Sequence, residues 1–277
     1  MPVFLALLAS LIWGTSDFLG GTVTKKLPAV TTLLWANLLV LPGLLIVTLV
    51  IGDLQLTPTT IGWGIAAGIS GSLGICALYQ GLATGVMGVV APIASTSVVL
   101  PVIVGVVTGE SIGAVRGFGI AMAIGGIVLA GGPSVREFRS GGHRPLLFAG
   151  AAAILIGIFL IAMANGSQES ALSTLLVMRI TDVGLLLPMV LILGLTRVPG
   201  RAVLPSIAFI GAADLAANAL YGFAVHGSEM AITAVLVSLY PVVTLLMARR
   251  INQERLNREQ MIGVTLAMIG VAAVVLG

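Results

Sequence analysis

The feature that most constrains this chain is a succession of apolar runs, each long enough to cross a lipid bilayer as a helix. A transmembrane helix needs roughly 20 mostly apolar residues, and its backbone hydrogen bonds are satisfied within the helix itself. The sequence predicts ten spans, at residues 3–23, 30–51, 60–83, 87–108, 114–131, 146–164, 171–194, 203–225, 229–248 and 259–276. We therefore expect an all-α membrane protein with ten transmembrane helices.

Charged residues are too scarce for a soluble protein. They make up 8% of the chain, against about 25% in a typical soluble domain, so the outer surface must meet lipid. The connections are too short to fold as soluble domains, and any function must therefore be performed inside the membrane. The net charge of +3 does not indicate nucleic acid binding, because the basic residues form no stripe.

The two halves of the chain resemble each other. Four positions recur at a constant interval, and the pairs are Glu110 and Glu254, Gly119 and Gly263, Ala123 and Ala267, and Gly126 and Gly270. Each half holds five predicted spans, so the halves would enter the membrane from opposite sides. Such an inverted repeat is a transporter architecture. We expect one five-helix repeat over residues 1–132, a basic linker over 133–145 and a second repeat over 146–277.

The basic residues predict the orientation. Of the 13 in the chain, all but Arg116 and Arg179 fall in the odd-numbered connections between spans. By the positive-inside rule these connections face the cytoplasm. This places both termini on the non-cytoplasmic side of a plasma (inner) membrane.

Several segments resemble a known family. Residues 13–18 (WGTSDF) resemble the WG-x-x-x-F opening of the drug/metabolite transporter superfamily, in its EamA branch. Residues 238–241 (SLYP), followed by Glu254 and Gly263, are similar to the signature of that branch at spans nine and ten. The resemblance covers both halves, although Ser111 follows Glu110 where the pattern usually has a basic residue. It implies a membrane carrier of metabolites or drugs, often an exporter, with no particular substrate.

Polar side chains inside the predicted spans are the first candidates for a substrate site, because a charge deep in a bilayer costs at least about 2.5–3.5 kcal/mol. They are Asp17, Arg179, Asp182, Asp214 and Asn218. Arg179 and Asp182 are three residues apart and can form an ion pair. Asn218 lies one turn after Asp214 on the same helix face.

The carboxylates are also candidates for proton coupling. Burial disfavours the charged form of a carboxylate, whereas a neighbouring arginine favours it. We expect a carboxylate without a cationic partner to carry protons, with Asp214 as the first candidate and Asp17 as the second. The alternatives are an Asp214 satisfied by hydroxyl groups, an Arg179–Asp182 pair that only locks span seven, and an Asp17 solvated near the interface.

Aromatic residues supply further candidates. Trp13, Trp35 and Tyr240 could stack on a solute or a cationic group, with ordinary packing as the alternative. Tyr79 and Tyr221 occupy matched positions near span ends, where anchoring at the membrane interface is the simpler interpretation.

Prolines and small residues predict how the helices meet. Three prolines interrupt matching spans: Pro92 and Pro101 in span four and Pro241 in span nine. They predict bends that gate the transport site, with passive kinks as the alternative. Small residues lie on one face of span five (Gly119, Ala123 and Gly126) and on one face of span ten (Gly263, Ala267 and Gly270). These small-residue faces predict close helix packing, within a half or between subunits. Glu110 and Glu254 are expected to cap the helix that follows each of them.

Motifs for enzymatic chemistry are missing: the sequence has no P-loop, zincin or nucleophile-elbow motif. We expect no cofactor and no metal, and the one cysteine, Cys76, cannot form an intrachain disulfide. The leading hypothesis is a secondary transporter that moves small polar or amphipathic solutes such as amino acids outward, with proton exchange as one energy source. The alternatives are a multidrug or lipid-like solute exporter, an intramembrane enzyme and an assembly subunit. The expected partners are a solute and membrane lipid, with a homodimer as one candidate assembly.

Overall fold

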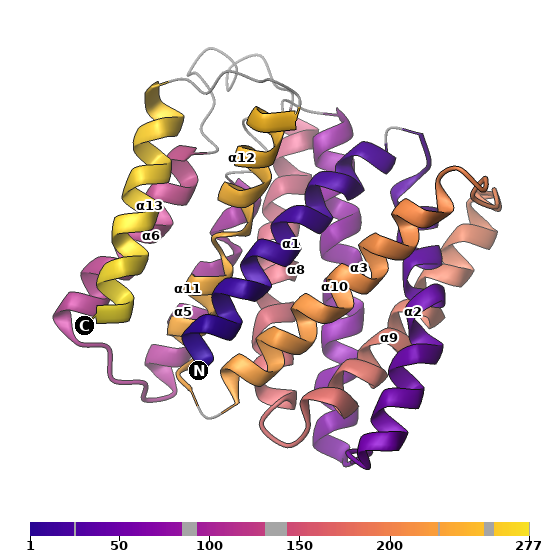
Figure 1. Ribbon diagram of the computed structural model, residues 1–277, viewed down its shortest axis with the longest axis horizontal. Coiled ribbons are helices and arrows are strands. Elements are labelled where there is room, and N and C mark those ends of the chain that lie inside the picture. The colour runs from indigo at the N-terminus through magenta and orange to yellow at the C-terminus, as the bar shows by residue number, and fades with distance from the viewer. Residues whose placement is uncertain (25, 85–92, 131–142, 227, 252–257, 277) are drawn as a thin grey trace.

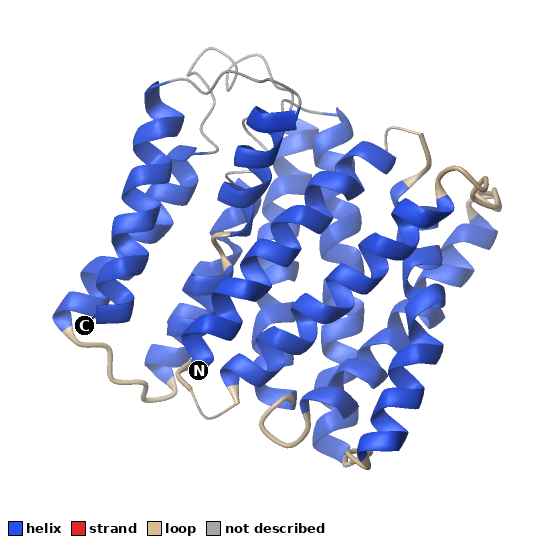
Figure 2. Ribbon diagram, in the orientation of Figure 1, coloured by secondary structure: helices blue, strands red, loops and turns tan. Residues whose placement is uncertain are grey.

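The computed structural model describes residues 1–24, 26–84, 93–130, 143–226, 228–251 and 258–276. These residues form a bundle of helices joined by short connections, and none of them lies in a strand (Figure 2). The helices are α1 (Pro2–Val23), α2 (Ala29–Ile51), α3 (Pro58–Thr84), η1 (Thr96–Val98), α5 (Val99–Val107), α6 (Ala114–Ala130), α8 (His143–Gly166), α9 (Ala171–Ile192), α10 (Leu204–Val225), α11 (Met230–Val237), α12 (Tyr240–Ile251) and α13 (Arg258–Leu276).

In the described residues, each of the ten predicted spans corresponds to one helix or to two consecutive helical segments; residues 87–92 of span four lie outside them. Seven of the described helices are long and apolar enough to cross a membrane, and the shorter apolar helices span Ile93–Val107, Ala114–Ala130 and Met230–Thr244. Many large apolar side chains are exposed, Val107 and Ile192 by 80% and 84%. Lipid contact explains an exposed apolar surface of this extent. The prediction of an all-α, multi-pass membrane protein is confirmed.

The main contacts between helices of the two halves are symmetric: a contact from one half to the other has a counterpart in the reverse direction. The third span of each half packs against the first span of the other, as α3 against α8 and α10 against α1. The pairs α3–α9 and α10–α2 are related in the same way, while α2–α9 and α6–α13 join equivalent spans (Figure 1). This arrangement agrees with two inverted five-helix repeats.

The small-residue faces hold α6 and α13 together inside one chain. A side chain on Gly126 would collide with the backbone of Gly263 and Ala267, and one on Gly270 would collide with the backbone of Ala123. The two backbones are therefore in contact, as small residues permit in membrane helices. The sequence left open whether these faces meet within a half or between subunits, and they meet between the halves.

Spans four and nine are broken at matching places. The 3-10 segment η1 precedes α5, and Ser238 and Leu239 separate α11 from α12. Pro101 and Pro241 lie in the first turns of α5 and α12, where the missing N–H has no partner within its own helix. The predicted interruptions of spans four and nine are therefore present, each on the N-terminal side of its proline, and a gating role stays a prediction. Pro92 lies outside the described residues.

Both termini lie at one end of the bundle, and the α9–α10 connection, which carries Arg197 and Arg201, lies at the other end (Figure 1). This agrees with an even number of crossings and with the predicted separation of basic residues. The side that faces the cytoplasm remains a prediction from the charges.

At the end that holds the termini, Glu110 joins the two halves. Its carboxylate accepts hydrogen bonds from the backbone N–H groups of Met230 (2.6 Å) and Ala231 (2.9 Å). It therefore caps α11 in the second half, and the expectation that it caps the next helix, α6, is wrong. Arg116 and Glu229 form an ion pair of 3.1 Å nearby. Glu254 lies outside the described residues.

A second set of contacts joins the halves at the same end, between the α2–α3 and α8–α9 connections. The Asp53 carboxylate accepts a hydrogen bond of 2.8 Å from the Ser170 hydroxyl. The Gln55 backbone N–H donates to the Ser173 hydroxyl oxygen at 2.8 Å, and the Thr57 hydroxyl donates to Glu169. These contacts and the Glu110 cap bridge the halves on the predicted non-cytoplasmic side.

Candidate functional site

A cavity with a volume of about 110 Å³ lies between the two halves. That volume can hold several water molecules or part of a small solute. Its lining comes from α1, α2, α3, η1, α8, α9, α10, α11 and α12, together with Ser238 between the last two. Spans one to four and six to nine thus contribute, whereas α6 and α13 do not line it.

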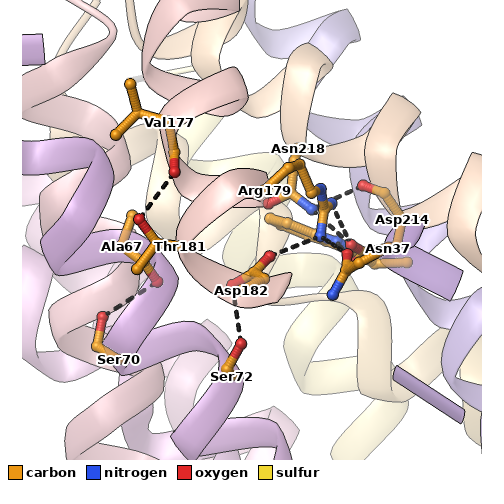
Figure 3. A network of polar contacts seen from close by, with 11 residues as sticks. Asn37, Ala67, Ser70, Ser72, Val177, Arg179, Thr181, Asp182, Asp214 and Asn218 are labelled. Carbon is orange, nitrogen blue, oxygen red and sulfur yellow. Dashed lines mark hydrogen bonds and ion pairs between the residues drawn. The ribbon is translucent and has the colours of Figure 1, made fainter. Parts of the chain in front are cut away.

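Arg179 is at the centre of a polar network beside this cavity (Figure 3). Its Nη1 donates hydrogen bonds to Asn37 Oδ1 at 2.7 Å and to Asp182 Oδ2 at 3.2 Å. Its Nη2 donates to Asp214 Oδ2, and the Ser72 hydroxyl donates to Asp182 at 2.8 Å. The predicted Arg179–Asp182 ion pair is confirmed.

Asp214 has a cationic partner, contrary to the reasoning that made it the first candidate for proton coupling. Besides the bond from Arg179, its Oδ1 accepts from Trp13 Nε1 at 3.0 Å. Its Oδ2 also accepts from Asn218 Nδ2 at 3.0 Å, which confirms that the two residues share a face. Its side chain is 34% exposed, against 5% for Arg179 and 6% for Asp182. Asp214 is therefore the member of the network that the cavity contents can reach.

Asp17 differs from the other carboxylates of the cavity. It lies one turn after Trp13 on α1 and lines the cavity. Within the described part of the chain it has no hydrogen-bond or ion-pair partner. The criterion of a carboxylate without a cation therefore selects Asp17 over Asp214.

The aromatic residues gather around Trp13. Its ring centre lies 6.3 Å from that of Phe159, 6.0 Å from Tyr221 and 6.4 Å from Tyr240. Trp13, Phe159 and Tyr240 line the cavity. Tyr221 is fully buried, and its hydroxyl donates to the Leu160 carbonyl oxygen at 2.9 Å.

Three aromatic predictions need correction. Tyr221 is buried in the core and Tyr79 lines the cavity, so neither is an interface anchor. Trp35 is absent from the cavity lining and packs beside Val23 and Ile207. A solute contact for Trp35 is therefore not supported by its position. Periodicity alone did not reveal which face of each span points inward.

Several lining residues were missed by the sequence reasoning. Polar residues inside apolar spans were the available signal for Asn37, Ser72 and Ser238, since a polar group in a membrane helix needs a partner. Phe159 carried no such signal, because an aromatic residue in an apolar span is unremarkable in sequence.

Among the residues that the structure describes, two buried polar atoms beside the cavity have no partner. They are Asn218 Oδ1 and Arg179 Nε. In the described ranges no group of three or more histidine, cysteine or acidic residues is placed to hold a metal ion. The arrangement provides charged and hydrogen-bonding groups with an aromatic wall, which suits reversible binding of a small solute.

Comparisons with known proteins identify the fold and the family. No protein of curated function matches the chain. A solved structure described only as "Crystal structure of protein" superimposes with a TM-score of 0.82 at 15% sequence identity, covering 99% of this chain and 96% of the other. That similarity shows a shared fold. The sequence model of the EamA-like transporter family matches residues 1–132 and 143–276. This match includes almost every residue, and the chain belongs to the EamA-like transporter family.

Proposed function

We propose that this membrane transporter is a secondary active carrier that exports small polar or amphipathic solutes by alternating access. The observation that carries the proposal is the central cavity, because both inverted halves build it and it holds charged residues that a lipid-facing position could not tolerate. Rocking of the halves about this cavity would expose it to each side in turn.

The ends of the cavity suggest which side it faces. Leu78 and Tyr79 lie within the last two turns of α3, and Leu33 lies within the first two turns of α2. These turns are at the end of the bundle that the charge pattern assigns to the cytoplasm. The opposite end is bridged by the Glu110 cap and the Asp53 contacts. This is the arrangement expected of a carrier that loads its solute from the cytoplasm.

The broken helices would serve as moving parts. Ser97 in η1 and Ser238 between α11 and α12 both line the cavity. A helix break leaves backbone groups without intrahelical partners, so the segments on either side can change angle without disrupting a continuous ladder. We assign the gates to these breaks and the proton-coupling role to Asp17.

A flux measurement tests the proposal. Solutes that raise the melting temperature of the purified protein would be loaded into proteoliposomes, and their exchange across the membrane would be measured with and without a pH gradient. Movement driven by the pH gradient is expected, and Asp17→Asn is expected to abolish that drive.

The alternatives predict different outcomes. An intramembrane enzyme would convert a stabilising ligand rather than move it, which product analysis would detect. An assembly subunit would show neither flux nor conversion. Its most suitable surface, the small-residue faces of α6 and α13, is already paired inside the chain.

A further inference from the structure

We propose that the solute of the central cavity is a small organic cation with an apolar or aromatic part, such as a protonated amine, held between Asp17 and the Trp13 ring. The inference rests on the proposed transport function and narrows its solute class. Three features of the cavity carry it: the sign of its charges, the type of its unpartnered polar atoms, and its aromatic wall.

The charged side chains that line the cavity are predominantly acidic. They are the carboxylates of Asp17, Asp182 and Asp214 and the guanidinium of Arg179. With all four ionised, three negative charges and one positive charge leave an excess of two negative charges. An uncompensated charge is strongly unfavourable in the membrane interior. The cavity therefore needs positive charge, from protons or from the solute.

Arg179 is poorly available to an anionic group. Its Nη1 already donates to Asn37 and Asp182, and its Nη2 donates to Asp214. The nitrogen without a partner, Nε, is buried. A solute carboxylate would have to displace Asp182 or Asp214 from the guanidinium and would add a fourth negative charge. Anions and zwitterions are therefore disfavoured.

Two acceptors beside the cavity have no donor among the described residues, and only one of them is open to the solute. Asp17 has no partner among the described residues. Asn218 Nδ2 donates to the backbone oxygen (2.7 Å) and the carboxylate (3.0 Å) of Asp214, so its Oδ1 points elsewhere and is left without a donor. The reversed amide would place an oxygen against that carboxylate, so the network determines the amide orientation. Asn218 Oδ1 is as buried as Arg179 Nε, so the half-buried Asp17 carboxylate is the acceptor that a solute N–H group can reach.

The aromatic wall completes a site for a cation. Trp13 and Tyr240 line the cavity with ring centres 6.4 Å apart, and Phe159 lies at 6.3 Å from Trp13 on another helix. The hydrogen bond from Trp13 Nε1 to Asp214 fixes the indole. Indole and phenol faces attract ammonium groups, and the attraction grows when the pair is desolvated.

Protons compete with such a solute for Asp17. Other titratable groups in the cavity are Tyr79 on α3, Tyr240 on α12, Asp214 on α10 and the Arg179–Asp182 pair on α9. Of these, Asp182 and Asp214 share the single positive charge of Arg179, whereas Asp17 has no cationic partner among the described residues and is left to take either a proton or a cation. Exchange of one monovalent cation for one proton moves no net charge across the membrane.

Four probes that share a phenyl ring test the charge preference. They are benzylammonium, phenylalanine, 3-phenylpropionate and benzyl alcohol, which are cationic, zwitterionic, anionic and neutral. Trp13 is the cavity-lining tryptophan among the three in the chain. Its emission can be followed in a Trp35→Phe/Trp63→Phe background. We expect benzylammonium to bind at least about 10-fold more tightly than each of the others, a difference of roughly 1.4 kcal/mol.

The variants separate the carboxylate from the fold. Asp17→Asn should remove the preference for benzylammonium and its weakening at low pH, and Asp17→Glu should retain both. The matched control is Glu259→Gln, which alters an exposed carboxylate in the first turn of α13. Comparable elution and melting temperature would show that each variant folds.

The outcomes distinguish this inference from the function on which it rests. Equal or tighter binding of phenylalanine or 3-phenylpropionate, absence of benzylammonium binding, or an unchanged preference in Asp17→Asn would each overturn the cation assignment. Flux of a zwitterion or anion in proteoliposomes would leave the transporter function standing. Binding of benzylammonium without flux would support the cation site and contradict the proposed transport.

Discussion

Removal of the Arg179 guanidinium should be the most destabilising single change in the polar network. The Arg179 side chain is 5% exposed and bonds to Asn37, Asp182 and Asp214. Arg179→Met would keep most of the side-chain volume but leave two carboxylates near each other without a cation. Removing one partner of a buried ion pair typically costs about 3–5 kcal/mol. Protonation of one carboxylate could recover part of that loss, so we expect about 3 kcal/mol at neutral pH.

The assay is reversible unfolding of the purified protein by titration with denaturing detergent, with helix content as the readout. A triple variant, Arg179→Met with Asp182→Asn and Asp214→Asn, separates charge from packing. An ion-pair group replaced as a whole often costs little, so the triple variant should recover most of the stability lost in Arg179→Met. A loss below about 1 kcal/mol in Arg179→Met, the range of a surface pair, would refute the reasoning. So would a triple variant that is less stable than the single one.

Three further predictions concern packing, capping and the aromatic wall. Gly126→Leu should force α6 away from α13, because the new side chain would meet the Ala267 backbone. It should lower the free energy of unfolding by about 1–3 kcal/mol. Gly125→Leu, whose side chain would meet open space, is the matched control in the same unfolding assay. Glu110→Ala should cost about 0.5–2 kcal/mol by leaving the first N–H groups of α11 without an acceptor. Arg116→Ala, which breaks a partly exposed ion pair, should cost less than about 1 kcal/mol. The reverse order in unfolding measurements would contradict the cap assignment. Trp13→Phe should weaken solute binding in a thermal-shift titration, whereas Trp35→Phe should leave it unchanged because Trp35 lies outside the cavity lining.

Features that depend on local sequence were predicted well. The ten spans and the two-half organisation follow from apolar runs and spaced repeats. Glu110 shows how far this reasoning extends: its position after span four suggested a cap, yet the helix it caps begins at Met230, in the other half. Local sequence identified the chemistry of the carboxylate, and the tertiary arrangement chose its partner.

The candidate site divides in the same way. Five polar residues stand out in sequence because a polar group inside an apolar run needs a hydrogen-bond or ion-pair partner. They are Asp17, Arg179, Asp182, Asp214 and Asn218. Pairing within one helix was predicted, as for Arg179 and Asp182, but pairing between helices was not. The bond from Arg179 to Asp214 joins α9 to α10, and that from Trp13 to Asp214 joins α10 to α1. Those contacts reversed the order of the two proton-coupling candidates.

What the sequence by itself determined is the set of membrane helices. Lipid offers no hydrogen-bond partners, so each apolar run must satisfy its backbone locally, and a local rule can be read from a local pattern. What only the tertiary structure decided is which helix faces meet. Lipid surrounds the helices with material as apolar as their own side chains, so hydrophobicity does not mark an inward face. Close packing of small residues, as between α6 and α13, and the partners of a few buried charges decide it instead, and these join segments far apart in the chain.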